Sequence, residues 1–131
     1  MVGSMSNFVN LNEALQSMKT DPSTARDPIK RMFVFDGAFT TADVAVIEGK
    51  RKALHTHREH DELVLILEGE ADFQVGKETR HVRVGDLILI PRDTLHGPSL
   101  LDGGRLAALS VFAPFFDRSK PDIQWEPEEG V

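Results

Sequence analysis

The chain has 131 residues, of which 40% are hydrophobic, and this size and composition suit a single domain with a real core. Its formal net charge is -6 and its basic residues form no cluster, which excludes nucleic acid or an anionic membrane as the expected main partner and favours a small-molecule ligand. The chain has no cysteine, so disulfides, thiolate metal sites and a cysteine nucleophile are excluded.

The sequence has neither the pattern of a membrane span nor that of a signal peptide. There is no run of about 18 apolar residues that would span a bilayer, and the N-terminus lacks the basic-then-apolar pattern of a signal peptide. We therefore expect a soluble cytoplasmic protein. Met1 to Ser4, ahead of a second methionine at Met5, resemble the remnant of an expression tag.

Residues 8–19 have the spacing of one short amphipathic helix. Apolar side chains recur at intervals of three and four residues, at Leu11, Ala14, Leu15 and Met18. Asn10 is the candidate N-cap, and Glu13 completes a capping-box arrangement. The proline-containing stretch 20–28 is predicted to end the helix as a loop.

After Ile29 the spacing becomes that of short strands. Apolar or alternating runs, bounded by turn residues such as Gly69-Glu70 and Gly85-Asp86, cover 32–35, 42–47, 62–67, 71–75, 79–84, 87–90 and 106–112. Many short strands in one small domain predict an antiparallel sandwich or barrel of the jelly-roll kind. We expect three segments: residues 1–28 as tag remnant, helix and loop, 29–113 as the barrel, and 114–131 as an extended surface arm that Trp125 pins to the body.

The run from Glu62 to Leu67 is apolar on both faces after Glu62 itself, so we expect a strand buried on both sides. Either the N-terminal helix or a second subunit could cover its outer face, and the sequence leaves both open. Because Leu63, Leu65 and Leu67 would form a large apolar patch on a monomer, we predict a homodimer.

The most informative polar residues lie just before this run. His55 and His57 are two apart, a spacing that puts both imidazoles on the same face of an extended strand. A hairpin could bring the carboxylate of Glu62 back toward them. His96 follows a strand that ends in a proline turn, and an antiparallel fold could lay it over the same point. Imidazoles and a carboxylate that converge in this way form a ligand set for a divalent transition metal.

These residues resemble the two sequence motifs of the cupin superfamily. The first motif is matched at Gly49, His55, His57, Glu62 and Gly69, and the second at Gly85, Pro91 and His96. The chain departs from the second motif at Asp93, where the family has glycine, and at Leu100, where it has asparagine. Aspartate can adopt the left-handed turn conformation that glycine serves, and Leu100 lies outside the ligand set, so neither change removes the predicted site.

The resemblance spans roughly residues 33–112 and implies an all-β fold, a double-stranded β-helix (jelly-roll) barrel, here with a short N-terminal helix. It implies that His55, His57, Glu62 and His96 hold one divalent metal, whether iron, manganese, nickel, cobalt or zinc. Cupins include oxygenases, isomerases and decarboxylases acting on small oxygen-rich molecules, and also non-catalytic metal-binding, ligand-binding or sensing modules. If the protein is an enzyme, Glu62 is the candidate catalytic residue, because it could leave the metal to move a proton.

Several alternatives stay open at the level of sequence. The barrel could keep the four residues for structure alone, and His60 could replace one of them as a ligand. His81, on an alternating strand, is interpreted as a half-exposed surface residue. Arg51 and Arg92 flank the motifs and could steer an anionic substrate, although solvated surface arginines would have the same pattern.

Overall fold

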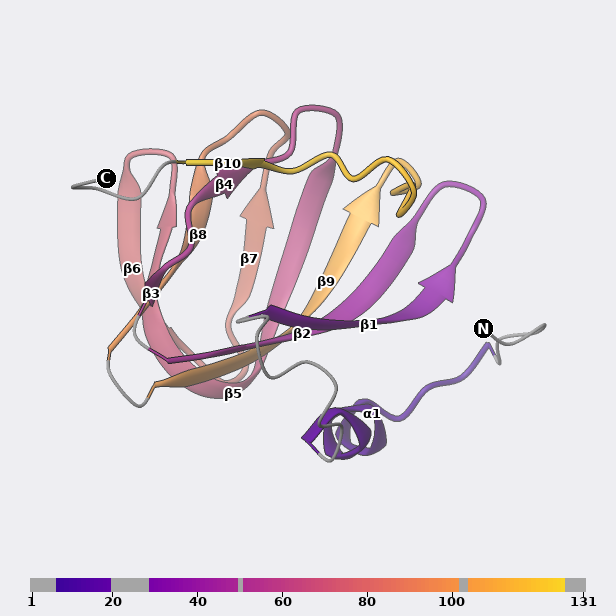
Figure 1. Cartoon of the computed structure of the whole chain (residues 1–131), viewed down its shortest axis with the longest axis horizontal. Coiled ribbons are helices and arrows are strands. Elements are labelled where there is room, and N and C mark those ends of the chain that lie inside the picture. The colour runs from indigo at the N-terminus through magenta and orange to yellow at the C-terminus, as the bar shows by residue number, and fades with distance from the viewer. Residues whose placement is uncertain (1–6, 20–28, 50, 102–103, 127–131) are drawn as a thin grey trace.

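The computed structural model describes residues 7–19, 29–49, 51–101 and 104–126. The expected tag remnant at residues 1–4 and the expected loop at 20–28 lie outside these ranges. The described strands form one sheet that curls into an open-sided barrel, with a single helix packed outside it (Figure 1). No described helix is long and apolar enough to cross a membrane.

The elements follow one another with short connections. The helix α1 spans Leu11–Lys19, and the strands are β1 (Ile29–Asp36), β2 (Thr41–Glu48), β3 (Arg51–Lys52), β4 (His55–Thr56), β5 (Asp61–Val75), β6 (Glu78–Arg83), β7 (Leu87–Ile90), β8 (His96–Leu100), β9 (Arg105–Ala113) and β10 (Gln124–Trp125). The fold is therefore all-β apart from α1, as the strand pattern predicted.

The central strand of the barrel is β5, which runs through both halves of the curled antiparallel sheet. Its first half pairs with β9 and β7, and its second half pairs with β6 and β8. The order β1-β2-β9-β5-β8-β4-β10 then wraps round an interior lined by alternate residues of each strand. The buried side chains inside this wrap include Val64, Ile66, Phe73, Ile90, Leu100 and Leu106.

The prediction of two separate strands at 62–67 and 71–75 is wrong, because β5 runs through Gly69 without a turn. The pairing with β9 shifts register between Ile66 and Glu68, which is a bulge, and Gly69 follows it with φ 82°. A Cβ on Gly69 would lie 2.0 Å from the carbonyl oxygen of Arg105. Glycine here lets the backbones approach and bends the strand from one half of the sheet into the other, and it does not end it.

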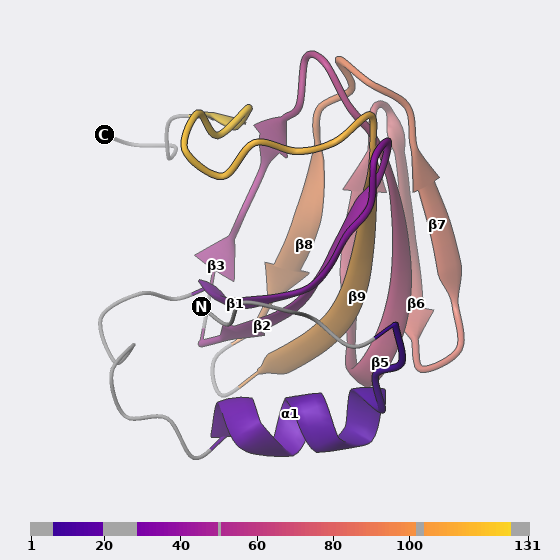
Figure 2. The same ribbon diagram turned by 90° about the vertical axis from the view of Figure 1, so that its right-hand side faces the viewer.

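The helix α1 covers part of the outer face of the barrel (Figure 2). The side-chain oxygen of Asn10 accepts the backbone N–H of Glu13 at 3.0 Å, which confirms Asn10 as the N-cap. One side of the helix is buried against β1, β2 and β9 in a cluster that contains Leu15, Met18, Val34, Val44, Val46 and Ala107. The helix therefore shields the outer face of these three strands from solvent.

The outer face of β5 is only partly covered. Leu67 packs against the helix cluster, but Leu63 is 41% exposed, so the expectation of a strand buried on both faces is wrong at that position in a single chain. On the neighbouring strand β7, Leu89 lies opposite Leu63 and Leu87 lies opposite Leu65, and both leucines of β7 are more than half exposed. The helix stops short of this apolar strip.

The segment after β9, residues 114–126, crosses the open side of the barrel and ends in β10, which pairs with β4. Phe116 of this segment is buried, and the ring centroid of Trp125 lies 4.7 Å from that of His55. We call residues 114–126 the arm. It is packed into the barrel at several points, although Trp125 itself is half exposed.

Candidate metal centre

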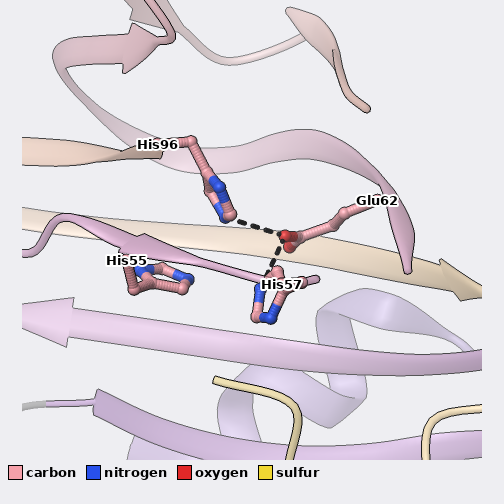
Figure 3. A group of neighbouring side chains, drawn as sticks. All are labelled: His55, His57, Glu62 and His96. Carbon is pink, nitrogen blue, oxygen red and sulfur yellow. Dashed lines mark ion pairs between the residues drawn. The ribbon is translucent and has the colours of Figure 1, made fainter. Parts of the chain in front are cut away.

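The structure brings His55, His57, Glu62 and His96 together inside the barrel (Figure 3). One potential ligand atom from each side chain lies within 4.8 Å of the others, and all four residues are buried. They come from β4, the connection that follows it, the start of β5 and the start of β8. We call these four residues the histidine–glutamate cluster.

Strand pairing sets this convergence. His55 and His96 lie directly opposite each other in the β4–β8 ladder, and their ring centroids are 4.3 Å apart. The turn before β8 is fixed to the other strand, because the backbone N–H of Asp93 donates to the carbonyl of His57 at 2.6 Å. Asp93 has φ 59°, the left-handed conformation that the sequence predicted at this position.

Each histidine of the cluster is oriented by a backbone carbonyl. Nδ1 of His55 lies 3.1 Å from the carbonyl oxygen of Ala53. Nδ1 of His57 lies 2.6 Å from that of Asp122, and Nδ1 of His96 lies 2.8 Å from that of Thr94. Because a carbonyl oxygen can only accept, each Nδ1 must donate its proton. In a neutral imidazole the other nitrogen, Nε2, then carries a lone pair.

The Nε2 atoms of His57 and His96 each lie 3.2 Å from Oε1 of Glu62. Such distances fit ion pairs if the rings are protonated, yet all three atoms lack a hydrogen-bond partner among the described residues. We favour neutral rings, because a buried imidazolium is costly and three rings share the site. Lone pairs of two nitrogens and an oxygen then face one another with no proton between them. A bound cation removes that repulsion, so the donor set fits a metal.

The electrostatics of the site favour the metal-binding protonation states. Burial and the neighbouring His96 and His57 lower the pKa of His55 to about 3. Burial alone would raise the pKa of Glu62, but the neighbouring His57 and His96 outweigh it and lower the pKa. At neutral pH the cluster is thus a carboxylate with at least one firmly neutral imidazole, the forms that ligate metals.

The arm supports the cluster through Asp122, a residue the sequence analysis did not single out. Its carbonyl holds His57, and its carboxylate accepts the backbone N–H groups of Arg58 at 3.0 Å and Glu59 at 2.7 Å. The same carboxylate lies 2.7 Å from Nδ1 of His60. Burial would raise the pKa of Asp122, but these hydrogen bonds, the one with His60 first, lower it to about 2. Asp122 therefore ties the arm to the connection between two cluster residues.

His60 is buried, but both of its ring nitrogens contact residues outside the cluster. Its Nδ1 faces Asp122, its Nε2 lies 3.1 Å from the carbonyl of Phe115, and its ring lies 4.8 Å from that of Phe116. Both ring nitrogens are already engaged, so this arrangement gives His60 no role as a substitute ligand.

The remaining polar residues from the sequence analysis lie outside the site. His81 is exposed between Glu70 and Asp72, which confirms its interpretation as a surface residue. Arg92 is exposed, and its backbone N–H donates to Asp61. The side chain of Arg51 lies outside the described part of the structure.

A second buried carboxylate, that of Asp43 on β2, also escaped the sequence analysis. Its side chain is fully buried, and Oδ2 lies 3.3 Å from the guanidinium of Arg31. Burial raises the pKa of Asp43 to about 6, although the charge of Arg31 opposes this. The available signal was one acidic residue inside an otherwise apolar strand, residues 42–47.

The curled antiparallel sheet and the buried cluster together define a double-stranded β-helix of the cupin type. Residues 42–112, more than half of the chain, match the model of the Cupin domain family. The chain therefore belongs to the cupin family, as the motifs indicated. No curated protein matches its sequence.

Solved structures with the same fold are similar to most of the chain. An uncharacterised conserved protein with a double-stranded β-helix domain from Klebsiella pneumoniae has TM-score 0.70 and 18% identity, with 94% of this chain and 99% of that chain covered. KdgF from Halomonas sp. has TM-score 0.67 and 22% identity, with 91% and 100% covered. Pac13 of Streptomyces, a nucleoside dehydratase whose structure holds uridine, has TM-score 0.63 and 16% identity, with 78% and 81% covered. At these identities the likeness establishes the fold alone.

Proposed function

We propose that the protein is a metal-dependent enzyme that acts on a small oxygen-rich molecule. His55, His57, Glu62 and His96 would hold one divalent transition metal, whether iron, manganese, nickel, cobalt or zinc. The reaction would be of the oxygenase, isomerase or decarboxylase type. The presence of a nucleoside dehydratase among the similar folds supports catalysis by analogy only.

One observation carries the proposal: the Nε2 atoms of His57 and His96 each lie 3.2 Å from Oε1 of Glu62, and none of the three atoms has a hydrogen-bond partner among the described residues. A barrel that kept these residues for structure alone would leave these atoms unsatisfied in a buried site. A cation at the common point would satisfy each of these atoms at once.

A metal with four protein ligands retains open coordination positions and supplies Lewis-acid chemistry to a substrate there. The protein residues around it orient the ligands and exclude water. The rings of Phe112 and Phe116 lie edge-on to His57, with centroids 5.1 and 6.0 Å away. Glu62 is the candidate catalytic residue, since it is the carboxylate of the cluster and could leave the metal to accept a substrate proton.

The alternative is a non-catalytic module that binds a metal and a small ligand, or senses one. The same cluster would serve it equally well. Such a module differs from the enzyme in that it releases its ligand chemically unchanged.

The first experiment is elemental analysis of protein purified without added metal. About one transition-metal ion per chain is expected in the wild type, and the His81→Ala variant should retain it. The metal-loaded protein is then incubated with a panel of small hydroxylated and carboxylated metabolites, with and without oxygen. Binding without conversion of any compound would favour the alternative, and absence of a metal would contradict both.

We also propose that the chain forms a homodimer through the exposed apolar strip of Leu63, Leu87 and Leu89. This strip continues the outer apolar face of the sheet that α1 covers over the neighbouring strands, and a second chain would cover it in the same way. Light scattering should give twice the chain mass for the wild type and the single mass for Leu89→Lys. Leu101→Lys, at an 82% exposed leucine outside the strip, is the matched control. A monomeric wild type at high concentration would contradict the dimer.

A further inference from the structure

The histidine–glutamate cluster is closed to solvent in the described structure. Its four residues are between 1% and 7% exposed, and Oε1 of Glu62 and the Nε2 atoms of His57 and His96 are buried. A metal ion or a small molecule therefore reaches these atoms only if part of the protein moves. The segment that moves should contact the cluster and be held less firmly than the strands of the barrel.

The strands around the cluster are poor candidates for such a movement. Glu62 of β5 is paired with Phe112 of β9 on one side and with Ile90 of β7 on the other. Phe112 and Ile90 are both buried, so shifting either strand would open the core. Another opening, between β6 and β7, has Phe73 and Val82 in its walls and none of the four cluster residues. Because Phe73 and Val82 belong to the core, a path from there would also disrupt it.

The end of the arm is held much less firmly. After Phe116, none of the described residues of the arm is buried. The strand β10 has two residues, and so does β4, with which it pairs. The backbone N–H of Glu126 adds one hydrogen bond, to the carbonyl of Leu54 at 3.0 Å. Residues 124–126 are thus attached along one short edge of the sheet.

Trp125 places this segment against the cluster. It lies opposite His55 in the β10–β4 ladder, so both side chains point to the same face, and their ring centroids are 4.7 Å apart. His55 is buried, whereas Trp125 is 52% exposed. The indole is therefore the layer between His55 and solvent where β10 lies beside β4 (Figure 1).

Asp122 supplies a fixed point just before this segment. Its carboxylate accepts the backbone N–H groups of Arg58 and Glu59, and its carbonyl accepts the Nδ1 proton of His57. Residues after Asp122 can move while these bonds stay intact, so His57 keeps its orientation. In the moving part, Oε1 of Gln124 is buried without a hydrogen-bond partner among the described residues, which makes the closed position less stable than a fully bonded one.

We propose that residues 124–126 form a gate that swings away from β4, about Asp122, while the barrel stays folded, and that its opening admits a metal and small ligands to the cluster. The proposal rests on the proposed function for what enters, because the opening itself requires no ligand. When the gate is closed, Trp125 shields the cluster from water. When it opens, His55 is exposed first, since the two rings are in contact.

A disulfide across the gate tests whether its opening limits entry. The chain has no cysteine, so Thr56→Cys with Gln124→Cys, at opposite positions in the β10–β4 ladder, introduces two thiols and no others. With Co²⁺ as the probe, uptake by the oxidised metal-free protein should be at least about tenfold slower than uptake by the same protein after reduction. Equal rates would overturn the gate. A pair that does not oxidise would contradict the closed position of β10.

The matched control is Gln74→Cys with Thr79→Cys, at opposite positions in the β5–β6 ladder. This disulfide fixes two strands of the barrel and leaves β10 free, so its oxidation should not change the rate of Co²⁺ uptake. Slowing by both disulfides would mean that the barrel itself opens, and it would overturn the gate.

Truncation of the gate should have the opposite effect. Trp125→Ala removes the ring that covers His55, so Co²⁺ uptake should be at least about tenfold faster than in the wild type. Phe39→Ala, at an 81% exposed aromatic residue between β1 and β2, is the control and should leave the rate unchanged. Uptake by Trp125→Ala at the wild-type rate would overturn the gate.

Amide hydrogen exchange of the metal-free wild type separates the gate from the proposed function. Relative to an unstructured peptide, the amide of Glu126 should exchange at least about 100-fold faster than that of Ile66, which donates to Asp86 within the barrel. Equal exchange would contradict the gate whether or not a metal binds. Fast exchange at Glu126 in a protein that binds no metal would support the gate and contradict the proposed function, whereas a bound metal with equal exchange would do the reverse.

Discussion

Two groups of histidine and carboxylate in this protein have the same chemistry and opposite surroundings. Inside the barrel, Oε1 of Glu62 lies 3.2 Å from His57 and 3.2 Å from His96. On the surface, His81 lies 2.9 Å from Glu70 and 2.9 Å from Asp72. The surface contacts are shorter, yet the interior group is the candidate metal centre, so distance alone does not identify such a site.

Burial and hydrogen-bond partners make the difference. Both ring nitrogens of His81 face carboxylates, so the hydrogen bonds to Asp72 and Glu70 raise its pKa, and a proton completes the group. In the barrel each Nδ1 already donates to a carbonyl, and burial lowers the pKa of His55. A proton satisfies the surface group, whereas the buried interior group fits a metal cation.

The largest expected effect is loss of the metal from His57→Ala. Removing one imidazole leaves Glu62 and His96 without the geometry of the full cluster, so metal content should fall from about one ion per chain to near zero. Elemental analysis after gel filtration measures it. His81→Ala is the matched control and should keep the ion. A His57→Ala protein that retains the wild-type ion would place the metal elsewhere.

Asp122→Ala should weaken metal binding without abolishing it. The variant keeps the carbonyl that orients His57 but loses the carboxylate that holds Arg58 and Glu59, so affinity should fall about 10- to 100-fold, as for other outer partners of metal ligands. Competition with a chromophoric chelator gives the constant. Asp117→Ala, at an exposed carboxylate elsewhere on the arm, is the control. Equal losses of metal affinity in both variants would mean that any change in the arm weakens binding, and that the carboxylate of Asp122 has no particular role.

Acidification should change the contributions of the interior and surface groups to the stability of the fold in opposite directions. The pKa of His55 falls from 6.5 to about 3 on folding, so below pH 6.5 the unfolded chain takes up the proton first and the stability of metal-free protein declines. His81 has a raised pKa, so its contribution is present below the unfolded pKa and is lost as pH rises through the folded value.

His55→Gln should therefore flatten the loss of stability on acidification, whereas His81→Gln should slightly steepen it. Urea unfolding of metal-free protein at a series of pH values gives both slopes. Equal slopes for the two variants would mean that burial does not separate the two groups.

The smallest effect concerns salt. Because His81 and its carboxylate partners are mostly exposed, added salt should move its pKa back toward 6.5. NMR titration of its ring signals at low and high ionic strength measures the change. A salt-independent pKa would indicate that the surface group is less solvated than its exposure implies.

Local patterns in the sequence predicted what depends on neighbours along the chain. The alternation of apolar and polar residues predicted most of the strands, and the two-residue spacing of His55 and His57 predicted that both rings lie on the same face of the chain. The motif added His96, whose position depends on a turn, and Asp93 adopts the backbone conformation expected there. The five-residue strand β8 that carries His96 was not predicted, because its residues include Gly97 and Pro98, two residue types that are depleted in strands.

What sequence could not supply depends on contacts between distant segments. Asp122 is an acidic residue in a proline-containing tail until β10 pairs with β4 and brings it to His57. Asp43 and Arg31 meet only because β1 pairs with β2, and neither belongs to a motif. Gly69 was read as a turn because the close approach of Arg105 comes from another strand.

The hydrogen bond from His57 to Asp122 also orders events during synthesis. All four cluster residues leave the ribosome before Asp122 does, because it follows them in the chain. The barrel strands can pair while the arm is still being made, but Nδ1 of His57 has no acceptor until the arm crosses to β4. The cluster is thus completed by a segment that emerges after it, and its full affinity for a metal follows the closing of the arm.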